Sequence, residues 1–124
     1  MPENLPKKIV IVATHGIEAP ERATIPFVMA NAALAMDSKV AVVLQSDGVA
    51  IATKGIQEHI LAPGFDPLKK LVDSFFEFGG TLLVCIPCIE ARKIPPDALI
   101  PGAQPVKAGR VVSEMLEASA VVTY

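Results

Sequence analysis

The chain has 124 residues, of which 52% are hydrophobic and 19% charged, and its formal net charge at pH 7 is −2. Domains of about 100–150 residues are the commonest, so we expect residues 1–124 to form a single domain. The slight negative charge, the scattered lysines and arginines and the lack of Trp argue against nucleic acid as a partner.

The distribution of apolar residues bears on location and assembly. No segment approaches the run of about 20 apolar residues that spans a bilayer, so we expect no membrane partner. The first eight residues lack the apolar core and cleavage site of a signal peptide, which predicts a cytoplasmic protein with reduced thiols. Because the charged share lies below the usual ~25% and a small domain has much surface, we expect a homo-oligomer that covers the excess apolar residues.

Four apolar segments rich in β-branched residues predict strands. They cover residues 8–13, 39–45, 81–85 and 120–124. Their apolar residues are continuous rather than alternating, which is typical of strands covered on both faces, and helical segments separate them. The pattern predicts an α/β fold with a parallel sheet between two layers of helices.

The first helix is predicted to begin at Pro20 or Thr24 and to end at Ala35. Because a proline deep inside a helix removes a hydrogen bond, Pro26 is best placed in the first turn, which favours Thr24 as the N-cap. We expect five apolar residues of this region to enter the core: Phe27, Met29, Ala33, Leu34 and Met36.

Two further long helices and two short ones are predicted. The second helix should have Asp66 as its N-cap and Pro67 as its first residue, and Gly79-Gly80 should end it. Its expected apolar stripe is Leu68, Leu71, Val72, Phe75 and Phe76. A third helix over 106–118 should turn four residues inward: Val111, Val112, Met115 and Leu116. Short helices are expected over 55–61 and 87–93, and the prolines near residues 95 and 101 predict an irregular connection.

Three turns follow the first three predicted strands. They are Thr14-His15-Gly16, Ser46-Asp47-Gly48 and the segment that starts at Cys85. In an open parallel sheet, the carboxyl ends of the strands meet at one edge, where ligands bind. We therefore expect the three turns to gather around one site.

The pair Cys85-Ile86-Pro87-Cys88 is the main candidate for chemistry. A thiol placed before a helix faces free N–H groups that stabilise the thiolate and lower its pKa, and Arg92 or Lys93 adds positive charge unless solvated. The spacing in a reducing compartment favours reactivity over a buried, inert pair. A thioredoxin-like dithiol is one alternative, although the third strand comes late in the chain. A zinc site would need His15 and His59 as further ligands and is not expected.

His15 is the other candidate site residue, because its turn follows the first strand at the same edge. It is suited to exchange a proton with a cleft thiol, and a capping or loop role is the alternative. His59 reads as a surface residue. Neither a glycine-rich dinucleotide motif nor a Walker motif is present, so we expect no organic cofactor and no nucleotide.

Several blocks of sequence resemble the DsrE/DsrF-like family of small sulfur-handling proteins. They are ATHG at 13–16, PERATIPF at 20–27, MANAA at 29–33, LQSDGV at 44–49, HILAPG at 59–64 and VCIPCIEAR at 84–92. The resemblance covers nearly the whole chain. It implies a single three-layer domain with an open, mainly parallel five-stranded sheet, flavodoxin-like or DsrEFH-like, and assembly into trimers or hexamers.

The resemblance also implies cytoplasmic sulfur transfer. Cys85 matches the active cysteine of the family, which takes sulfane sulfur as a persulfide or thiosulfonate and passes it to a partner such as a TusA-like carrier. Cys88 stands where several members have a small residue, so it resolves a persulfide at Cys85, shares the sulfur or has no role. The rivals to this interpretation are a Cys85–Cys88 dithiol switch and a non-catalytic oligomeric interaction subunit.

Overall fold

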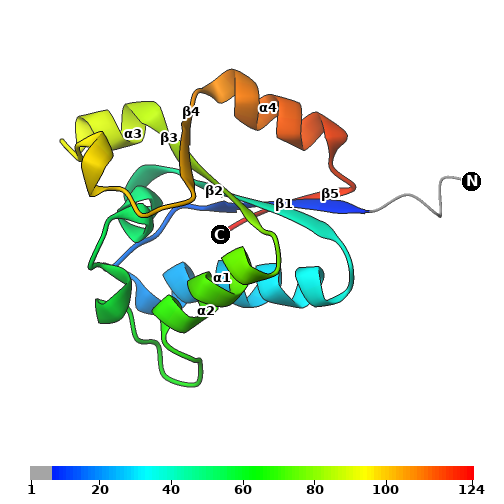
Figure 1. Cartoon of the computed structure of the whole chain (residues 1–124), viewed down its shortest axis with the longest axis horizontal. Helices are drawn as coiled ribbons and strands as arrows, with labels where there is room; N and C mark the ends of the chain where they lie inside the picture. Colours follow the sequence, from blue (N-terminus) through cyan, green and yellow to red (C-terminus); the bar gives the residue numbers. More distant parts are fainter. Residues whose placement is uncertain (1–6) are drawn as a thin grey trace, which may run out of the picture.

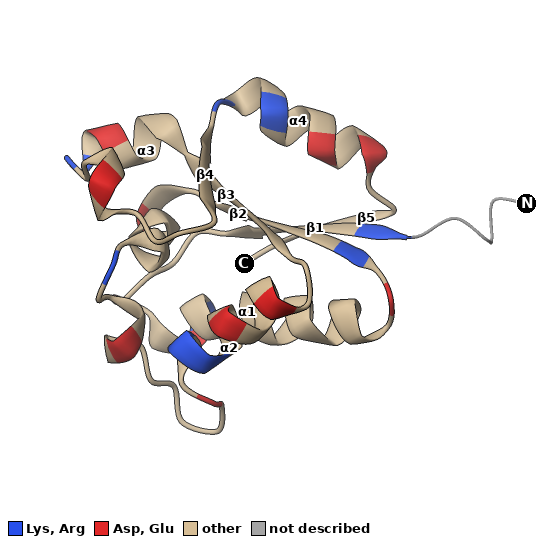
Figure 2. Ribbon diagram, viewed as in Figure 1, with Lys and Arg blue, Asp and Glu red and all other residues tan. Residues whose placement is uncertain are grey.

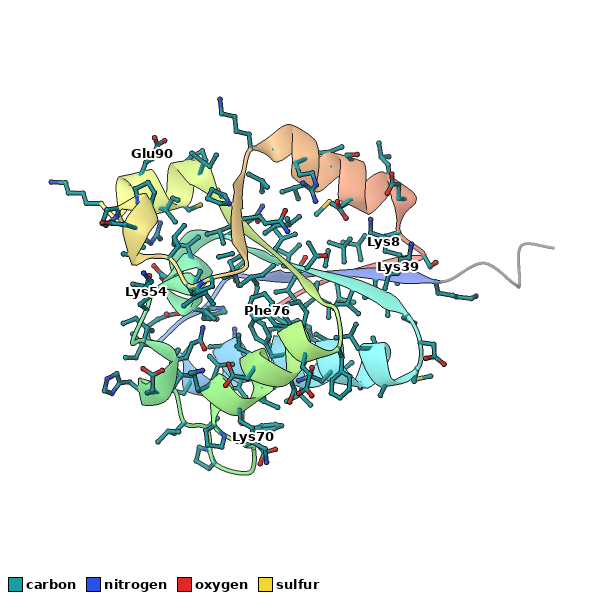
Figure 3. All side chains as sticks on the ribbon, in the orientation of Figure 1. Lys8, Lys39, Lys54, Lys70, Phe76 and Glu90 are labelled. Carbon is teal, nitrogen blue, oxygen red and sulfur yellow. The ribbon has the colours of Figure 1, made fainter. Side chains whose placement is uncertain are left out.

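The computed structural model describes residues 7–124 and contains a five-stranded sheet in the order β4-β3-β2-β1-β5. Every pair of neighbouring strands is parallel, which confirms the predicted parallel sheet and the five strands that the family resemblance implied. The strands are β1 (Lys8–Ala13), β2 (Lys39–Leu44), β3 (Thr81–Cys85), β4 (Ala103–Val106) and β5 (Ala120–Thr123). The one-to-one register of β1 on β2 places Lys8 beside Lys39 at the amino end of the sheet (Figure 3).

Helices cover both faces of the sheet, which explains the apolar sequences of the central strands (Figure 1). Helices α1 (Pro20–Ala35) and α2 (Leu68–Glu77) pack on one face, and α4 (Ala108–Glu117) crosses the other. Successive residues of β1 point to opposite faces of the sheet because the strand is pleated. Ile11 belongs to the core under α1 and α2, and Val10 belongs to the core under α4. A strand with both sets buried reads as a continuous apolar run.

The edge strand β4 was not predicted from the residue pattern. Its sequence, Ala103-Gln104-Pro105-Val106, contains one proline and one exposed glutamine, and within residues 7–124 it pairs only with β3. Proline is tolerated in an edge strand because a missing N–H there breaks no ladder bond. Val106 pairs with Cys85, so the predicted helix over 106–118 was placed too early and α4 begins at Ala108.

Helix α1 begins at Pro20 with Ala19 as its N-cap, so the prediction of Thr24 as N-cap was wrong. Thr24 is buried within the helix, where its hydroxyl donates to the carbonyl of Pro20 over 2.7 Å. Pro26 lies inside the helix rather than in its first turn. Because proline has no backbone N–H, the helix forms without the hydrogen bond that another residue would donate there. Phe27 and Ala33 are buried, and Leu34 is partly buried against the same core, as predicted.

Four residues that were predicted to lie in the core are exposed instead. Met29 and Met36 of the α1 region are 48% and 78% exposed, and Val112 and Leu116 of α4 are 51% and 82% exposed. Helix α4 meets the sheet along a narrow stripe in which Val111 is buried and Met115 half-buried. Val112 and Leu116 are each one residue further on, about 100° around the helix, where no element of the described chain covers them.

Helix α2 confirms its predicted apolar stripe but begins one residue later than expected. Pro67 is its N-cap in place of Asp66, and no side chain caps the helix. The end is as predicted, because Gly79 adopts φ +91° and the N–H of Gly80 donates to the carbonyl of Phe75 over 2.8 Å. Phe75 packs edge to face against Phe27 with ring centres 5.5 Å apart, which joins α2 to α1.

Short helices complete the connections. They are the 3₁₀ helices η2 (Ser46–Ala52), η3 (Gln57–His59) and η4 (Pro96–Ala98) and the α-helix α3 (Ile86–Ala91). The helix predicted over 55–61 is thus a single 3₁₀ turn, and the one predicted over 87–93 starts one residue earlier and ends two earlier. Charged residues of both signs are dispersed over the elements (Figure 2). Within residues 7–124, every helix is too short or too polar to cross a membrane.

Candidate functional site

The turns after β1 and β2 lie against each other at the carboxyl edge of the sheet. A Cβ atom added to Gly16 would stand 2.6 Å from the carbonyl oxygen of Asp47, and one added to Gly48 would stand 2.2 Å from that of Ala13. Both distances are shorter than side chains allow, so glycine at these two positions permits the close approach of the turns. The expected meeting of the first two turns is confirmed.

The segment after β3 joins the turn after β2 through a sulfur atom. The backbone N–H of Ser46 donates to Sγ of Cys88 over 3.2 Å. Ser46 has φ +53°, a left-handed conformation that is uncommon for a residue with a side chain. This contact brings the third predicted turn to the same edge as the second.

Arg92 fastens α3 to the turn after β2. Its Nη2 and Nε atoms donate to Oδ1 of Asp47 over 2.9 and 3.3 Å, and its Nη1 donates to the carbonyl of Cys88 over 3.2 Å. These contacts hold the guanidinium, and its positive charge, at the site, although the side chain is 34% exposed. Glu90, on the same helix, points outward from the molecule (Figure 3).

Cys85 is the last residue of β3 and the N-cap of α3, and Cys88 lies in the first turn of that helix. Both are free thiols and both are half-buried. Cys85 also pairs in register with Val106 of β4, so its backbone is held by the sheet. The two sulfur-bearing side chains pack against the core under α1 and α2 and keep part of their surface in solvent.

Burial raises the pKa of the Cys85 thiol, and interaction with the Cys88 thiol raises it further. The backbone amide of Cys88 and the Arg92 guanidinium act in the opposite direction and lower this pKa, as the sequence led us to expect. The net direction is upward, so the expected lowering was wrong. The reason is that the half-buried sulfur loses more hydration than these two groups replace.

His15 makes its polar contact with Glu18 rather than with either cysteine. The distance from its Nδ1 to Oε2 of Glu18 is 3.0 Å, and the other carboxylate oxygen accepts the N–H of Gly16 over 2.7 Å. Glu18 therefore holds the turn after β1 and the imidazole together. His15 lies at the same edge as the cysteines, on a different turn, and its role in proton exchange stays a prediction. His59 is exposed in η3, as predicted.

The backbone amide of Ser46 is the component of the site that the residue pattern does not show. The Ser46 side chain takes no part in the hydrogen bond to Cys88, so the residue type at this position gives no indication of the contact. The position of the turn after β2 was the available signal, and it placed Ser46 at the correct edge. Within residues 7–124, no three His, Cys, Asp or Glu side chains come together as a metal site would require.

Comparison with known proteins supports this fold and family. The model of the DsrE/DsrF-like family matches residues 7–124. An uncharacterized protein of Methanocaldococcus jannaschii is 33% identical over 87 residues. That match covers 70% of the chain and 32% of the relative, so the chain spans about a third of the length of this curated relative.

Two solved structures share the architecture. The ychN protein from E. coli matches with a TM-score of 0.80 and 22% identity, covering 95% of this chain and 99% of that one. A protein of unknown function from Methanobacterium thermoautotrophicum matches with a TM-score of 0.75 and 16% identity, covering 94% and 98%. With sequence identities of 22% and 16%, these two similarities establish the fold and do not extend to function.

Proposed function

Because this chain belongs to the DsrE/DsrF-like family, we propose that it carries or transfers sulfur in the cytoplasm, with Cys85 as the residue that takes the sulfur up. Membership of the family supports a sulfur-handling role in general. The observation that carries the more specific proposal is the position of Cys85. It is a half-buried free thiol at the carboxyl end of β3, beside a second thiol and a fixed guanidinium.

The surroundings of Cys85 suit a sulfur that alternates between thiol and persulfide. Burial raises the pKa of Cys85 and favours the thiol, whereas the Arg92 guanidinium and the Cys88 amide favour the anion. The Cys85 thiolate attacks the sulfane sulfur of a donor, a new S–S bond forms, and the donor leaves as a thiolate that takes a proton. An acceptor thiol then attacks the outer sulfur and releases Cys85 unchanged.

The acceptor in this proposal is a TusA-like carrier or another protein thiol. His15, at the same edge of the sheet, is proposed as a polar residue that exchanges protons during transfer. Exposed apolar side chains on α1, α4 and β5 favour a homo-oligomer, because a second copy of the chain would cover them. The family resemblance implies a trimer or hexamer. Residues 1–124 are proposed to act as one domain.

A dithiol switch is the second candidate function, and the proximity of Cys88 to Cys85 favours it. In that case the two thiols would cycle to a disulfide with a defined midpoint potential. Titration of the thiols against redox buffers measures this midpoint. The remaining rival, a non-catalytic interaction subunit, predicts packed cysteines, whereas both side chains are partly exposed.

The test of the proposal is sulfur loading, followed by intact mass. A persulfide on one cysteine adds about 32 Da. We expect Cys85→Ser to abolish the addition and Cys88→Ser to keep it after exposure to polysulfide, with both variants retaining the assembly state of the unmodified chain. Undiminished loading of the Cys85→Ser variant would show that the assignment is wrong.

A further inference from the structure

The sulfur of Cys88 is held beside Cys85 by a group from another part of the chain. Cys85 is the N-cap of α3 and Cys88 is the third helical residue, so both thiols belong to the first turn of one helix. The N–H of Ser46, which follows β2, donates to the Cys88 sulfur over 3.2 Å. This contact places the Cys88 sulfur beside the turn after β2, and the same sulfur interacts with the Cys85 thiol.

From this arrangement we propose a further activity: Cys88 cleaves a persulfide carried by Cys85, releases hydrosulfide and leaves a Cys85–Cys88 disulfide. The inference rests on the proposed function, because it requires sulfur on Cys85. It adds an outcome that simple transfer does not have, since the sulfane sulfur is reduced rather than handed on. The chain would then be a sulfide-releasing protein as well as a carrier.

The reaction balances without any further group at the site. The Cys88 thiolate attacks the inner sulfur of the Cys85 persulfide, an S–S bond forms between the two residues, and the bond to the outer sulfur breaks. The outer sulfur leaves as HS⁻ with the persulfide proton and the electron pair of the broken bond. If the sulfane sulfur is counted at oxidation state zero, it gains two electrons on becoming HS⁻. The two cysteine sulfurs together lose two electrons on forming the disulfide. A dithiol reductant of the thioredoxin class must then reduce the disulfide before the next cycle.

The contacts of Cys88 fit an attacking group. The Ser46 N–H donates to the Cys88 sulfur over 3.2 Å and so holds this sulfur at the sheet edge, where it interacts with the Cys85 thiol. Pro87 fixes the backbone between the two cysteines at a φ that suits the helix, which limits how far the sulfurs can separate. Because both groups belong to one helical turn, the step is intramolecular and needs no encounter with a second thiol.

The environment of Cys85 fits the group that is attacked. Burial and the Cys88 thiol raise the pKa of the Cys85 thiol, so negative charge at this position is disfavoured. A protonated persulfide is the better electrophile, because its outer sulfur departs as hydrosulfide rather than as a doubly charged ion. Arg92, which binds the carbonyl of Cys88, supplies positive charge for the departing anion.

The experiment uses the full chain, reduced, freed of reductant under argon and mixed with one equivalent of glutathione persulfide. Intact mass in acid and released sulfide, trapped with monobromobimane, are followed for wild type, Cys85→Ser and Cys88→Ser. We expect wild type to end about 2 Da lighter, as the internal disulfide, with about one sulfide per disulfide. Cys88→Ser should hold the addition of about 32 Da and release at least about tenfold less sulfide.

The outcomes separate the two proposals. If wild type keeps its persulfide as long as Cys88→Ser does, the cleavage step is absent and the carrier function stands. If Cys88→Ser takes up no sulfur, or if sulfur loads Cys88 in Cys85→Ser instead, the carrier assignment fails and the inference fails with it. Cys88→Ala is run beside Cys88→Ser as a check, because alanine removes the acceptor of the Ser46 N–H while serine retains one.

Discussion

The N–H of Ser46 and the sulfur of Cys88, 42 positions apart in sequence, are joined by a hydrogen bond of 3.2 Å. This bond links the turn after β2 to helix α3, and Arg92 crosses the same gap to Asp47. Because the donor is a backbone group, changes to the Ser46 side chain leave it in place. The bond can be tested only from the sulfur side, which makes Cys88 variants the informative ones.

Replacing Arg92 by Gln should make Cys85 less reactive. The guanidinium lowers the pKa of the Cys85 thiol against the larger effect of burial, so its loss should raise this pKa further. At pH 8 we expect the rate of Cys85 alkylation by iodoacetamide to fall by roughly two- to tenfold, because only the thiolate reacts. Peptide mass mapping distinguishes Cys85 from Cys88.

Arg110→Gln is the matched control for Arg92. Arg110 is also an exposed arginine paired with a carboxylate, Glu114, over 2.8 Å, but it belongs to α4, away from the cysteines. Its replacement should leave the alkylation rate of Cys85 unchanged. Equal rates in both variants would mean that Arg92 holds the turn without affecting the charge on the sulfur.

Removing the Cys88 thiol should have the opposite effect on Cys85. Both the contact with this thiol and its charge raise the Cys85 pKa, so Cys88→Ala should lower it. The pH profile of Cys85 alkylation is expected to move to lower pH in this variant, with reaction detectable where the wild-type residue is still protonated. A profile that stays in place or moves upward would show that the two thiols do not interact in the folded chain.

The raised pKa of Cys85 has a consequence for stability. A thiol whose pKa is higher in the folded than in the unfolded chain stabilises the fold below the unfolded value, and this contribution is lost as pH rises through the folded value. We therefore expect the free energy of unfolding of wild type to fall more steeply above about pH 8.5 than that of Cys85→Ser. Urea titrations at pH 7, 9 and 10 measure the difference; parallel curves for the two chains would contradict it.

The strands could be predicted from the sequence to a greater extent than the helix faces. Continuous β-branched runs mark strands that are covered on both sides, so β1 and β3 were predicted with the bounds that they have. An edge strand lacks that signal, and β4 was missed because of Gln104 and Pro105. The exposure of Leu116 could not be foreseen, because apolar periodicity shows a stripe and does not show how wide a surface faces it.

The same division holds at the site. Parallel topology was sufficient to bring the turns containing His15, Ser46 and Cys85 to one edge, because carboxyl ends of parallel strands share an edge. The direction in which the pKa of Cys85 is shifted could not be predicted. It depends on how deeply the sulfur is buried, and local motifs contain no such information. The contact between His15 and Glu18 could have been predicted from their spacing of three residues, but it was not predicted.

At the other end of the sheet, Glu114 should stabilise the fold through Lys8 and Arg110. Its carboxylate meets Nζ of Lys8 at 2.5 Å and Nε of Arg110 at 2.8 Å, and its side chain is only 15% exposed. These contacts lower the pKa of Glu114, so the stabilisation is present above its unfolded pKa and is lost as pH falls through the folded value. We expect Glu114→Gln to cost about 1–2 kcal/mol near pH 7 and less near pH 3.

Glu117→Gln is the control for Glu114. Glu117 also binds Lys8, over 3.2 Å, but its side chain is 68% exposed, so the pair is screened by water. Its replacement should change the free energy of unfolding by less than about 0.5 kcal/mol. Comparable losses in the two variants, measured by urea unfolding in the same buffer, would count against a special role for Glu114.

The contact between the turns after β1 and β2 depends on Gly48, and Gly48→Ala should be among the most disruptive small changes in the chain. The added methyl group would stand 2.2 Å from the carbonyl oxygen of Ala13, a backbone atom that cannot move aside without shifting the end of β1. We expect a loss of more than about 2 kcal/mol in unfolding free energy and slower sulfur loading of Cys85, because the turn that holds Cys88 through Ser46 must shift. Gly109→Ala is the control: Gly109 lies in α4, no atom of residues 7–124 stands within 4 Å of the added Cβ, and the change should stabilise the chain by about 0.5–1 kcal/mol through helix propensity. If Gly48→Ala unfolds at the same urea concentration as wild type, the turns are free to separate, and the Ser46–Cys88 contact is not held by their packing.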